Sequence, residues 1–340
     1  MRKSIRTAVI ALIAATTLVT GARAANLNGA GGTAIYPLLS AWAKDYKQKT
    51  GIEVNYQAIG SGGGIKQIKA RTVDFANSDK PLTHDELAAS KLVQFPQAII
   101  SIVPVVNLPG ISPGALVLDG KTLAAIYLGA ITRWNDPVIR KLNPKLALPE
   151  MGIIPVHRSD GSGTTFNFTN YLAKVSPAWK STVGSDTAVA WPGGIGGKGN
   201  AGVAASVAQT AGAIGYVEYA YARQNRLAFT CLINAAGALV CPGPKSFQAA
   251  ARNADFSRVQ DFYLILTNQP GKDSWPVIAA TYMLMRADYP ADKNRAVLKF
   301  LDFALKDGRA AAQKLDYVPV PEETVKQIQT IWTKKLKAWP

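Results

Sequence analysis

Histidine, cysteine and acidic residues are scarce in this sequence. The chain of 340 residues has two His and two Cys, too few to supply a structural zinc cluster. It has 38 Lys and Arg against 22 Asp and Glu, a formal net charge of +16. This surplus permits an anionic partner without identifying it, and no basic motif interleaved with aromatic residues supports nucleic-acid binding. With 48% hydrophobic and 18% charged residues, the composition is typical of a globular protein.

Beyond its N-terminal region the sequence also lacks a hydrophobic run long enough to span a membrane. Three basic residues at the N-terminus precede the apolar run Ala8–Val19, which ends at the small-residue motif Ala22–Ala24. This pattern predicts a secretory signal peptide over residues 1–24. A membrane anchor is the alternative, but a run of about 12 residues is shorter than the ~20 that a spanning helix needs. Cleavage removes four basic residues and lowers the net charge from +16 to +12.

Motifs of nucleotide binding and catalysis are missing as well. No G-x-x-x-x-G-K-[ST] sequence is present, and the dinucleotide-like matches at Gly29 and Gly194 have no good leading strand in the predicted pattern. Around Ser162, Asp160 and Thr164 occupy positions that must be glycine in a nucleophile elbow. There is no H-E-x-x-H motif, and we expect both histidines to be structural or surface residues. The sequence therefore predicts a protein that is not an enzyme and that holds neither a cofactor nor a metal.

Strand-like and helix-like stretches alternate along the chain, which is typical of an α/β fold. The β-branched apolar run Ile99–Val106 predicts a strand that is buried on both faces. No long polar linker separates two halves, so we expect two lobes joined by short crossing strands near Ile99–Val106 and Trp275–Thr281. The patterns predict helices over residues 35–49, 65–71, 83–92, 121–128, 164–174, 200–209, 293–315 and 322–337, and strands over residues 52–58, 73–78, 99–106, 153–157, 214–218 and 277–285.

Three glycine-rich turns, each opening a predicted helix, carry the strongest chemical signal. They are Gly29–Thr33, Gly60–Gly64 and Arg158–Thr164. The start of a helix presents unpaired N–H groups, glycine lets an anion approach the backbone, and Ser or Thr adds a hydroxyl donor. A single turn of this kind is better explained by ordinary N-capping. Three of them, one with Arg158, favour an oxyanion site.

The two cysteines flank a turn signal between two short apolar runs. In a hairpin symmetric about Ala236, Cys231 and Cys241 face each other. An exported chain favours a disulfide between them, and two buried free thiols are the alternative.

Longer motifs follow one another in order between about Leu27 and Trp332. They are Asn28–Gly31, Val54–Gln57, Gly60–Gln67, Val73–Asp79, Leu118–Lys121, Asp160–Thr164, Gly196–Gly199 and Gly212–Val217. Together they resemble the phosphate-binding proteins of bacterial phosphate ABC transporters. The resemblance implies a two-lobed periplasmic binding protein (type II) with two crossing hinge strands and a ligand cleft between the lobes. We expect lobe I over residues 25–102 and 277–340, and lobe II over residues 103–276.

The resemblance also implies the ligand residues. Asp160 matches a family aspartate that pairs with the arginine and lies near the ligand. Ala34 departs from the family, which usually has a bulky aromatic residue there; the implied contact is a backbone N–H, and we expect Tyr36 to take over the side-chain cover. By position, the phosphate-binding residues are Thr33, Ala34, Ser61, Asp79, Arg158, Asp160, Ser162, Gly163 and Thr164.

Asp79 is the residue that we expect to select the ligand. A carboxylate only accepts hydrogen bonds, and phosphate carries a proton to donate at neutral pH whereas sulfate does not. The expected ligand is inorganic phosphate, bound in the periplasm by a monomer that delivers it to two permease subunits and, through them, to an ATPase. A binding protein for sulfate or molybdate and a secreted phosphatase are the alternatives; Asp79 argues against the first, and the missing nucleophile–base pair argues against the second.

Overall fold

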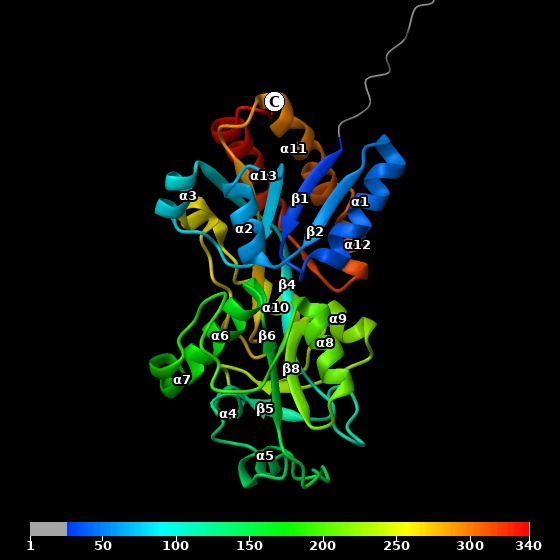
Figure 1. Ribbon diagram of the computed structural model, residues 1–340, viewed down its shortest axis with the longest axis vertical. Coiled ribbons are helices and arrows are strands. Elements are labelled where there is room, and N and C mark those ends of the chain that lie inside the picture. Colours follow the sequence, from blue (N-terminus) through cyan, green and yellow to red (C-terminus); the bar gives the residue numbers. More distant parts are fainter. Residues whose placement is uncertain (1–25, 340) are drawn as a thin grey trace, which may run out of the picture.

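One long strand, β4 (Leu92–Val106), runs from one half of the molecule into the other (Figure 1). The structure is a computed structural model and describes residues 26–339. Every residue of β4 is buried, as was predicted for its part Ile99–Val106, and the strand begins seven residues earlier than predicted. Its first part, residues 92–101, pairs with β12 (Ile278–Arg286), and residues 102–106 pair with β8 (Ala213–Glu218). Both lobes are therefore built on the same strand.

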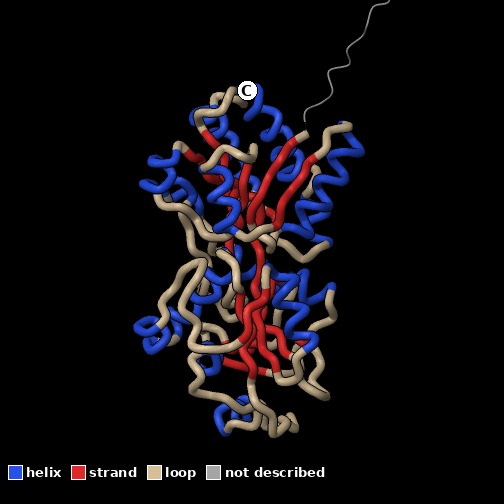
Figure 2. The backbone as a smooth tube through the Cα atoms, in the orientation of Figure 1, coloured by secondary structure: helices blue, strands red, loops and turns tan. Residues whose placement is uncertain are grey.

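The sheet continues from β4 into each lobe, in the order β2-β1-β3-β12-β4-β8-β6-β7. In lobe I, β1 pairs in parallel with β2 and β3, and β12 is antiparallel to both β3 and β4. In lobe II, β6 pairs in parallel with β7 and β8. Helices flank the strands in both lobes (Figure 2). A two-lobed α/β protein was predicted, and the fold confirms it.

The strands are β1 Leu27–Gly31, β2 Val54–Ala58, β3 Phe75–Ser78, β4 Leu92–Val106, β5 Val117–Asp119, β6 Ile154–Arg158, β7 Ile195–Gly197, β8 Ala213–Glu218, β9 Ala228–Phe229, β10 Cys231–Ile233, β11 Leu239–Val240, β12 Ile278–Arg286 and β13 Val318–Pro319. The α-helices are α1 Tyr36–Thr50, α2 Ser61–Lys69, α3 His84–Ser90, α4 Gly120–Tyr127, α5 Pro137–Leu142, α6 Gly163–Val175, α7 Pro177–Thr182, α8 Gly199–Gln209, α9 Tyr219–Gln224, α10 Pro244–Ala251, α11 Ala291–Lys306, α12 Arg309–Lys314 and α13 Glu322–Ile331. Short 3-10 turns form η1 Phe256–Arg258 and η2 Gln260–Phe262, and a π-turn forms η3 Trp332–Leu336.

Two predictions about secondary structure were wrong. The strand that appeared to be missing before Gly29 exists, because β1 includes the glycines themselves and ends at Gly31. The helix predicted over residues 293–315 is divided at Gly308 into α11 and α12. A Cβ at Gly308 would lie 2.4 Å from Trp42 Nε1, which donates a hydrogen bond to the Gly308 carbonyl. Packing against α1 thus divides the helix, although the hydrophobic periodicity of the sequence continues through this segment.

The lobe boundaries near residues 102 and 277 remain a proposal. The segment of η1 and η2, which this boundary places in lobe II, makes contacts with lobe I. The Gln94 side chain donates to the Asp261 carbonyl at 2.9 Å, and Lys335 forms an ion pair with the Asp261 carboxylate. We propose that this segment belongs to lobe II and packs against lobe I.

The predicted signal peptide, residues 1–24, lies outside the described residues. Within residues 26–339, no helix has the length and apolarity required to cross a membrane.

The predicted hairpin forms in lobe II. Strand β10 pairs antiparallel with β11 in the register Leu232↔Val240 and Ile233↔Leu239, so the centre is Ala236. This register sets Cys231 opposite Cys241, and a disulfide joins them. The alternative of two free thiols is wrong.

Removing this disulfide tests how much it contributes to stability. Because the bond closes a loop with a sequence separation of 10, we expect the Cys231→Ala/Cys241→Ala protein to lose about 2–3 kcal/mol of unfolding free energy in urea. Wild-type protein reduced with dithiothreitol is the control and should show the same loss. An unchanged urea midpoint for both samples would contradict the expectation.

Candidate anion-binding site between the lobes

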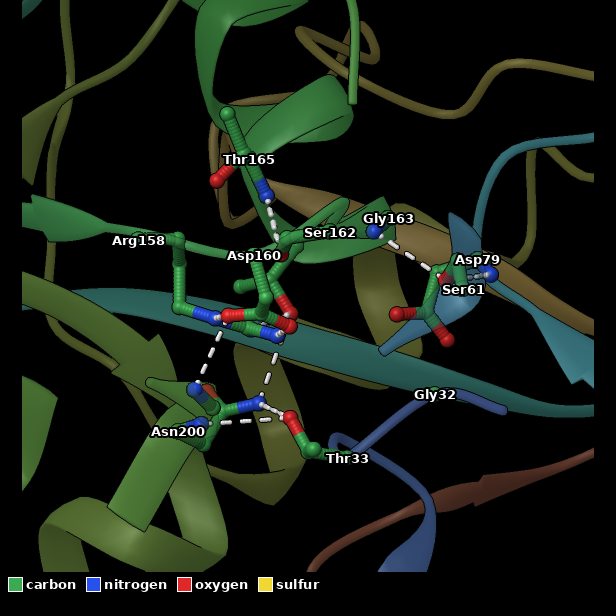
Figure 3. Close-up of polar contacts among 12 residues, drawn as sticks. Gly32, Thr33, Ser61, Asp79, Arg158, Asp160, Ser162, Gly163, Thr165 and Asn200 are labelled. Atoms are coloured by element: carbon green, nitrogen blue, oxygen red, sulfur yellow. Dashed lines mark hydrogen bonds and ion pairs between the residues drawn. The ribbon is translucent and has the colours of Figure 1, made fainter. Parts of the chain in front are cut away.

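The three glycine-rich turns meet at one place between the lobes (Figure 3). The first overlaps the end of β1 and precedes α1, the second connects β2 to α2, and the third connects β6 to α6. At their junction, a Cβ on Gly163 would lie 2.6 Å from both the Asp79 Cβ and Ser61 Oγ, so this close approach requires glycine. The turns thus bring hydroxyl groups and helix N-termini together at the carboxyl ends of strands, where α/β proteins bind ligands.

Arg158, at the end of β6, is the buried cation of the site. Its side chain forms a two-pronged ion pair with Asp160, with Nε–Oδ1 at 2.7 Å and Nη2–Oδ2 at 2.5 Å. Burial alone would raise the pKa of Asp160, but the hydrogen bonds and charge of Arg158 and the N–H of Gly199 outweigh burial and lower it. The pair therefore stays ionised, and Arg158 still points Nη1 toward Thr164 Oγ1, at 3.4 Å.

The hydroxyl oxygens of the site already accept hydrogen bonds from N–H groups of the protein. Ser61 Oγ accepts from the backbone N–H groups of Asp79 at 3.2 Å and Gly163 at 3.1 Å. Ser162 caps α6 by accepting from the Thr165 N–H at 3.0 Å. A hydroxyl has two acceptor positions and one hydrogen to donate; both acceptor positions of Ser61 are occupied, while Ser162 has one occupied and keeps its hydrogen. These serines are therefore set to donate to a ligand.

Asp79 is almost completely buried, 1% exposed, and sits beside this group of donors. Its Oδ1 accepts a hydrogen bond from Thr281 Oγ1 at 2.7 Å, and Thr281 in turn accepts from the Asn77 amide at 2.8 Å. Burial raises the pKa of Asp79 to about 6, against the opposing effects of the Thr281 hydrogen bond and the Arg158 charge. Among the described residues no donor reaches its Oδ2, which is left free to accept a proton-bearing ligand atom.

The first turn is fixed by tyrosines rather than by the alanine that follows Thr33. Ala34 is fully buried, and its backbone N–H has no acceptor within residues 26–339. Tyr56, from β2, donates to the Gly32 carbonyl at 2.9 Å. Tyr36, the expected cover, stacks on Tyr56 but is 43% exposed and lines a cavity of about 600 Å³ outside Thr33. Tyr56 therefore holds this turn.

Besides Tyr56 and Thr281, the sequence analysis missed two further supporting residues in lobe II. Tyr216, from β8, shares a hydrogen bond of 2.6 Å with Thr165 Oγ1 and accepts from the Arg158 N–H at 3.2 Å. Asn200, at the start of α8, contacts Thr33 and Thr164. Both lie in or next to motifs that carried the family resemblance, Gly212–Val217 and Gly196–Gly199. Their place in or beside these motifs is the sequence signal that could have identified them, although neither residue is at one of the predicted ligand positions.

The structure thus brings together all the residues that were predicted to bind the ligand. The Gly163 N–H does not point to the ligand alone, because it donates a hydrogen bond to Ser61 Oγ. In the part of the chain that the structure describes, no group of three or more His, Cys, Asp or Glu side chains could hold a metal ion. The arrangement offers one cation, neutral donors and a carboxylate acceptor to a small anion.

Comparison with known proteins agrees with this geometry. Residues 18–307 match the model of a family described as a PBP superfamily domain. The chain is 53% identical over 316 residues to phosphate-binding protein PstS of Xylella fastidiosa (strain 9a5c), covering 93% of this chain and 87% of that protein. It is 50% identical over 335 residues to the protein of the same name from Pasteurella multocida, covering 98% and 97%.

Solved structures share the fold. A high affinity periplasmic phosphate-binding protein (PfluDING), solved with phosphate, has a TM-score of 0.72 at 20% identity and covers 90% of this chain and 93% of its own. The phosphate binding protein from Stenotrophomonas maltophilia has a TM-score of 0.69 at 18% identity, with 90% and 94% covered.

Replacing Asp79 by Asn tests the cost of burying its carboxylate. A folded-state pKa near 6, above the ordinary 3.8, means that the wild type loses stability as the pH rises through this window and does not regain it above pH 6. At pH 7 the empty Asp79→Asn protein should therefore be more stable to urea by about 3 kcal/mol, and this advantage should vanish near pH 4. Asp45→Asn makes the same change at an exposed position of α1 and is the control; its stability at pH 7 should stay within about 0.5 kcal/mol of wild type. A less stable Asp79→Asn protein at pH 7 would refute the argument.

Proposed function

We propose that this chain, which belongs to the PstS family of phosphate-binding proteins within the PBP superfamily, binds inorganic phosphate and delivers it to an ABC-type phosphate importer. The observation that carries the proposal is the buried Asp79 carboxylate beside a set of hydroxyl and N–H donors. Its relatives are named as binding proteins, which favours a receptor over an enzyme. Thr33, Ala34, Ser61, Asp79, Arg158, Asp160, Ser162, Gly163 and Thr164 are the proposed phosphate-binding residues.

The balance of charge in the site supports a ligand that is held mainly by neutral donors. The charge of Arg158 is offset by Asp160 at hydrogen-bond distance. Excess positive charge is therefore absent among these side chains, and the affinity must come from hydroxyl and backbone N–H groups that are aimed at the anion. Buried donors in fixed directions stabilise an anion strongly because they are already ordered before it binds.

Asp79 supports phosphate over a fully deprotonated oxyanion. A P–OH group of the ligand can donate its proton to the carboxylate, whereas sulfate would face it as a second negative charge with no proton between them. The lost hydrogen bond and the uncompensated repulsion together amount to several kcal/mol in a buried site. This is the reason to prefer phosphate over the sulfate or molybdate alternative.

We further propose a periplasmic monomer whose lobes close on the ligand and then dock onto two permease subunits. Direct contacts between the lobes support closure. The Gly62 N–H donates to the Gly161 carbonyl at 2.9 Å, and Lys80 pairs with Asp186 at 2.7 Å. The Asn167 side chain donates to the Asp79 carbonyl at 2.7 Å. The first of these bonds joins the second and third turns, and the other two join the segment that follows β3 to lobe II.

Titration calorimetry with anion-free protein tests the ligand assignment. We expect wild-type protein to bind phosphate at least ~10³-fold more tightly than sulfate at pH 7.5. In Asp79→Asn the ratio should fall to about tenfold or less, because an amide can donate to either anion. Asp45→Asn is again the matched control and should keep the wild-type ratio. Equal affinity of the wild type for the two anions would rule out the phosphate assignment.

A side chain inserted between the lobes tests closure. A Cβ on Gly62 would lie 3.2 Å from the Gly161 Cα, so the larger side chain of Gly62→Val should hold the lobes apart. We expect phosphate to reduce the radius of gyration of the wild type in small-angle scattering, and to have no such effect on Gly62→Val, whose affinity should fall by about 100-fold or more. Lys66→Val puts the same residue on the exposed face of α2 and should behave as wild type. Compaction of Gly62→Val equal to that of the wild type would exclude this contact as the closing surface.

A further inference from the structure

A fourth glycine turn, Gly196–Gly199, leads into α8 and has no place in the proposed ligand set. The first residue after it, Asn200, is completely buried. Its Nδ2 donates to Thr33 Oγ1 at 2.7 Å and lies 3.4 Å from Thr164 Oγ1 (Figure 3). Its backbone N–H also donates to Thr33 Oγ1, at 3.1 Å. One asparagine therefore reaches a hydroxyl in each lobe.

We propose that Asn200 is a positioning residue that turns the hydroxyl groups of Thr33 and Thr164 into donors toward the bound anion, and that it acts on Thr33 only when the lobes are closed. The inference rests on the proposed function and adds to it a residue that does not touch the ligand. It explains why the Thr33 hydroxyl, whose backbone is held by the Tyr221 O–H on the Thr33 carbonyl at 2.8 Å, can contribute a hydrogen bond of fixed direction.

The orientation of the Asn200 amide follows from its other end. The Asn200 Oδ1 accepts a hydrogen bond from the Glu218 N–H at 2.8 Å, at the end of β8. That N–H is a donor only, so the oxygen of the amide must face β8 and the NH₂ group must face Thr33. A buried amide with both ends assigned in this way cannot flip without losing two hydrogen bonds, which costs several kcal/mol.

The consequence for Thr33 follows from counting its hydrogen-bonding capacity. A hydroxyl oxygen has two lone pairs and one hydrogen. Both lone pairs of Thr33 Oγ1 are used by Asn200, through its amide and its backbone N–H. Donation of the O–H hydrogen is then its one remaining hydrogen bond, and the anion is the acceptor. For Thr164 the corresponding partners are Asn200 and Arg158, both at 3.4 Å.

The dependence on closure comes from the two lobes. Thr33 belongs to the first turn of lobe I, while Asn200 stands on α8 of lobe II. The approach is close, because a Cβ on Gly199, where φ is +69°, would lie 3.3 Å from Thr33 Cγ2. Separation of the lobes removes both N–H groups from Thr33 Oγ1, and its hydroxyl is then free to rotate. Closure therefore completes the donor set at the same moment that it encloses the ligand.

A purely structural role of Asn200, fastening α8 to β8, predicts different behaviour in two experiments. The first uses Asn200→Asp, which keeps the shape and the bond to Glu218 but replaces the NH₂ donor by an acceptor. At pH 8 its phosphate affinity in calorimetry should fall by about 100-fold or more relative to wild type, because the threonine hydroxyls donate to the new carboxylate. Burial favours the neutral form of a carboxyl, so at pH 5 more of the new carboxyl carries a proton that it can donate, and the deficit relative to wild type at the same pH should be smaller than at pH 8. Asn253→Asp makes the same charge change at an exposed site of lobe II and should stay within about twofold of wild type.

The second experiment is a double-mutant cycle with neutral variants. Asn200→Ala should lower phosphate affinity by about tenfold in the wild-type background and by a clearly smaller factor in Thr33→Val, where only the Thr164 hydroxyl remains to be oriented. An equal loss in both backgrounds, or an Asn200→Asp deficit that is the same at pH 5 and pH 8, would overturn the inference. Failure of the wild type to bind phosphate would instead refute the proposed function. Should Asn200→Asp not fold, the cycle alone decides.

Discussion

The direction of each hydrogen bond is the constraint on which this site depends. An anion in a buried cleft needs donors, but a hydroxyl is both a donor and an acceptor, and Asp79 is an acceptor only. The protein resolves this by occupying the oxygens of its hydroxyls with its own N–H groups. Ser61 accepts from two backbone N–H groups, Ser162 accepts from one, and Thr33 accepts from Asn200. What remains toward the cleft is a set of hydrogens facing one carboxylate.

This requirement accounts for the surrounding architecture. Backbone N–H groups without a partner occur at the starts of helices, so the hydroxyls lie where α2, α6 and α8 begin. Those starts lie close together because β4 carries both lobes and because glycine at position 163 leaves no side chain at the junction. Trp275, fully buried where the chain crosses back, donates to the Ile102 carbonyl at 2.9 Å and ties the two crossing segments together. The segments that cross between the lobes therefore also position the site.

The sequence predicted the parts of this site that are local and missed those that are not. The glycine turns are short patterns that favoured an oxyanion site, and the family resemblance then implied the ligand positions and the Arg158–Asp160 pair. Asn77 and Thr281 are 204 residues apart, and Asn200 and Thr33 are 167 apart; no spacing rule connects such pairs. Likewise β1 was overlooked because its strand consists largely of the glycines read as a loop, and the division at Gly308 depends on Trp42, a residue of α1. No local sequence pattern could predict the contacts between the lobes.

The buried Asp79 carboxylate destabilises the empty site, and a ligand that brings a proton relieves this effect. Without a ligand, Asp79 is ionised at neutral pH although burial opposes its charge, and Arg158 gives limited relief because Asp160 holds it. A ligand that brings a proton supplies the hydrogen bond that the carboxylate lacks, whereas one without a proton adds a second charge beside it. The instability of the empty state and the choice of ligand therefore have one origin. The net charge of +12 expected for the exported chain acts elsewhere: most of it lies on exposed side chains, where it attracts anions at long range and is screened by salt, without choosing among them.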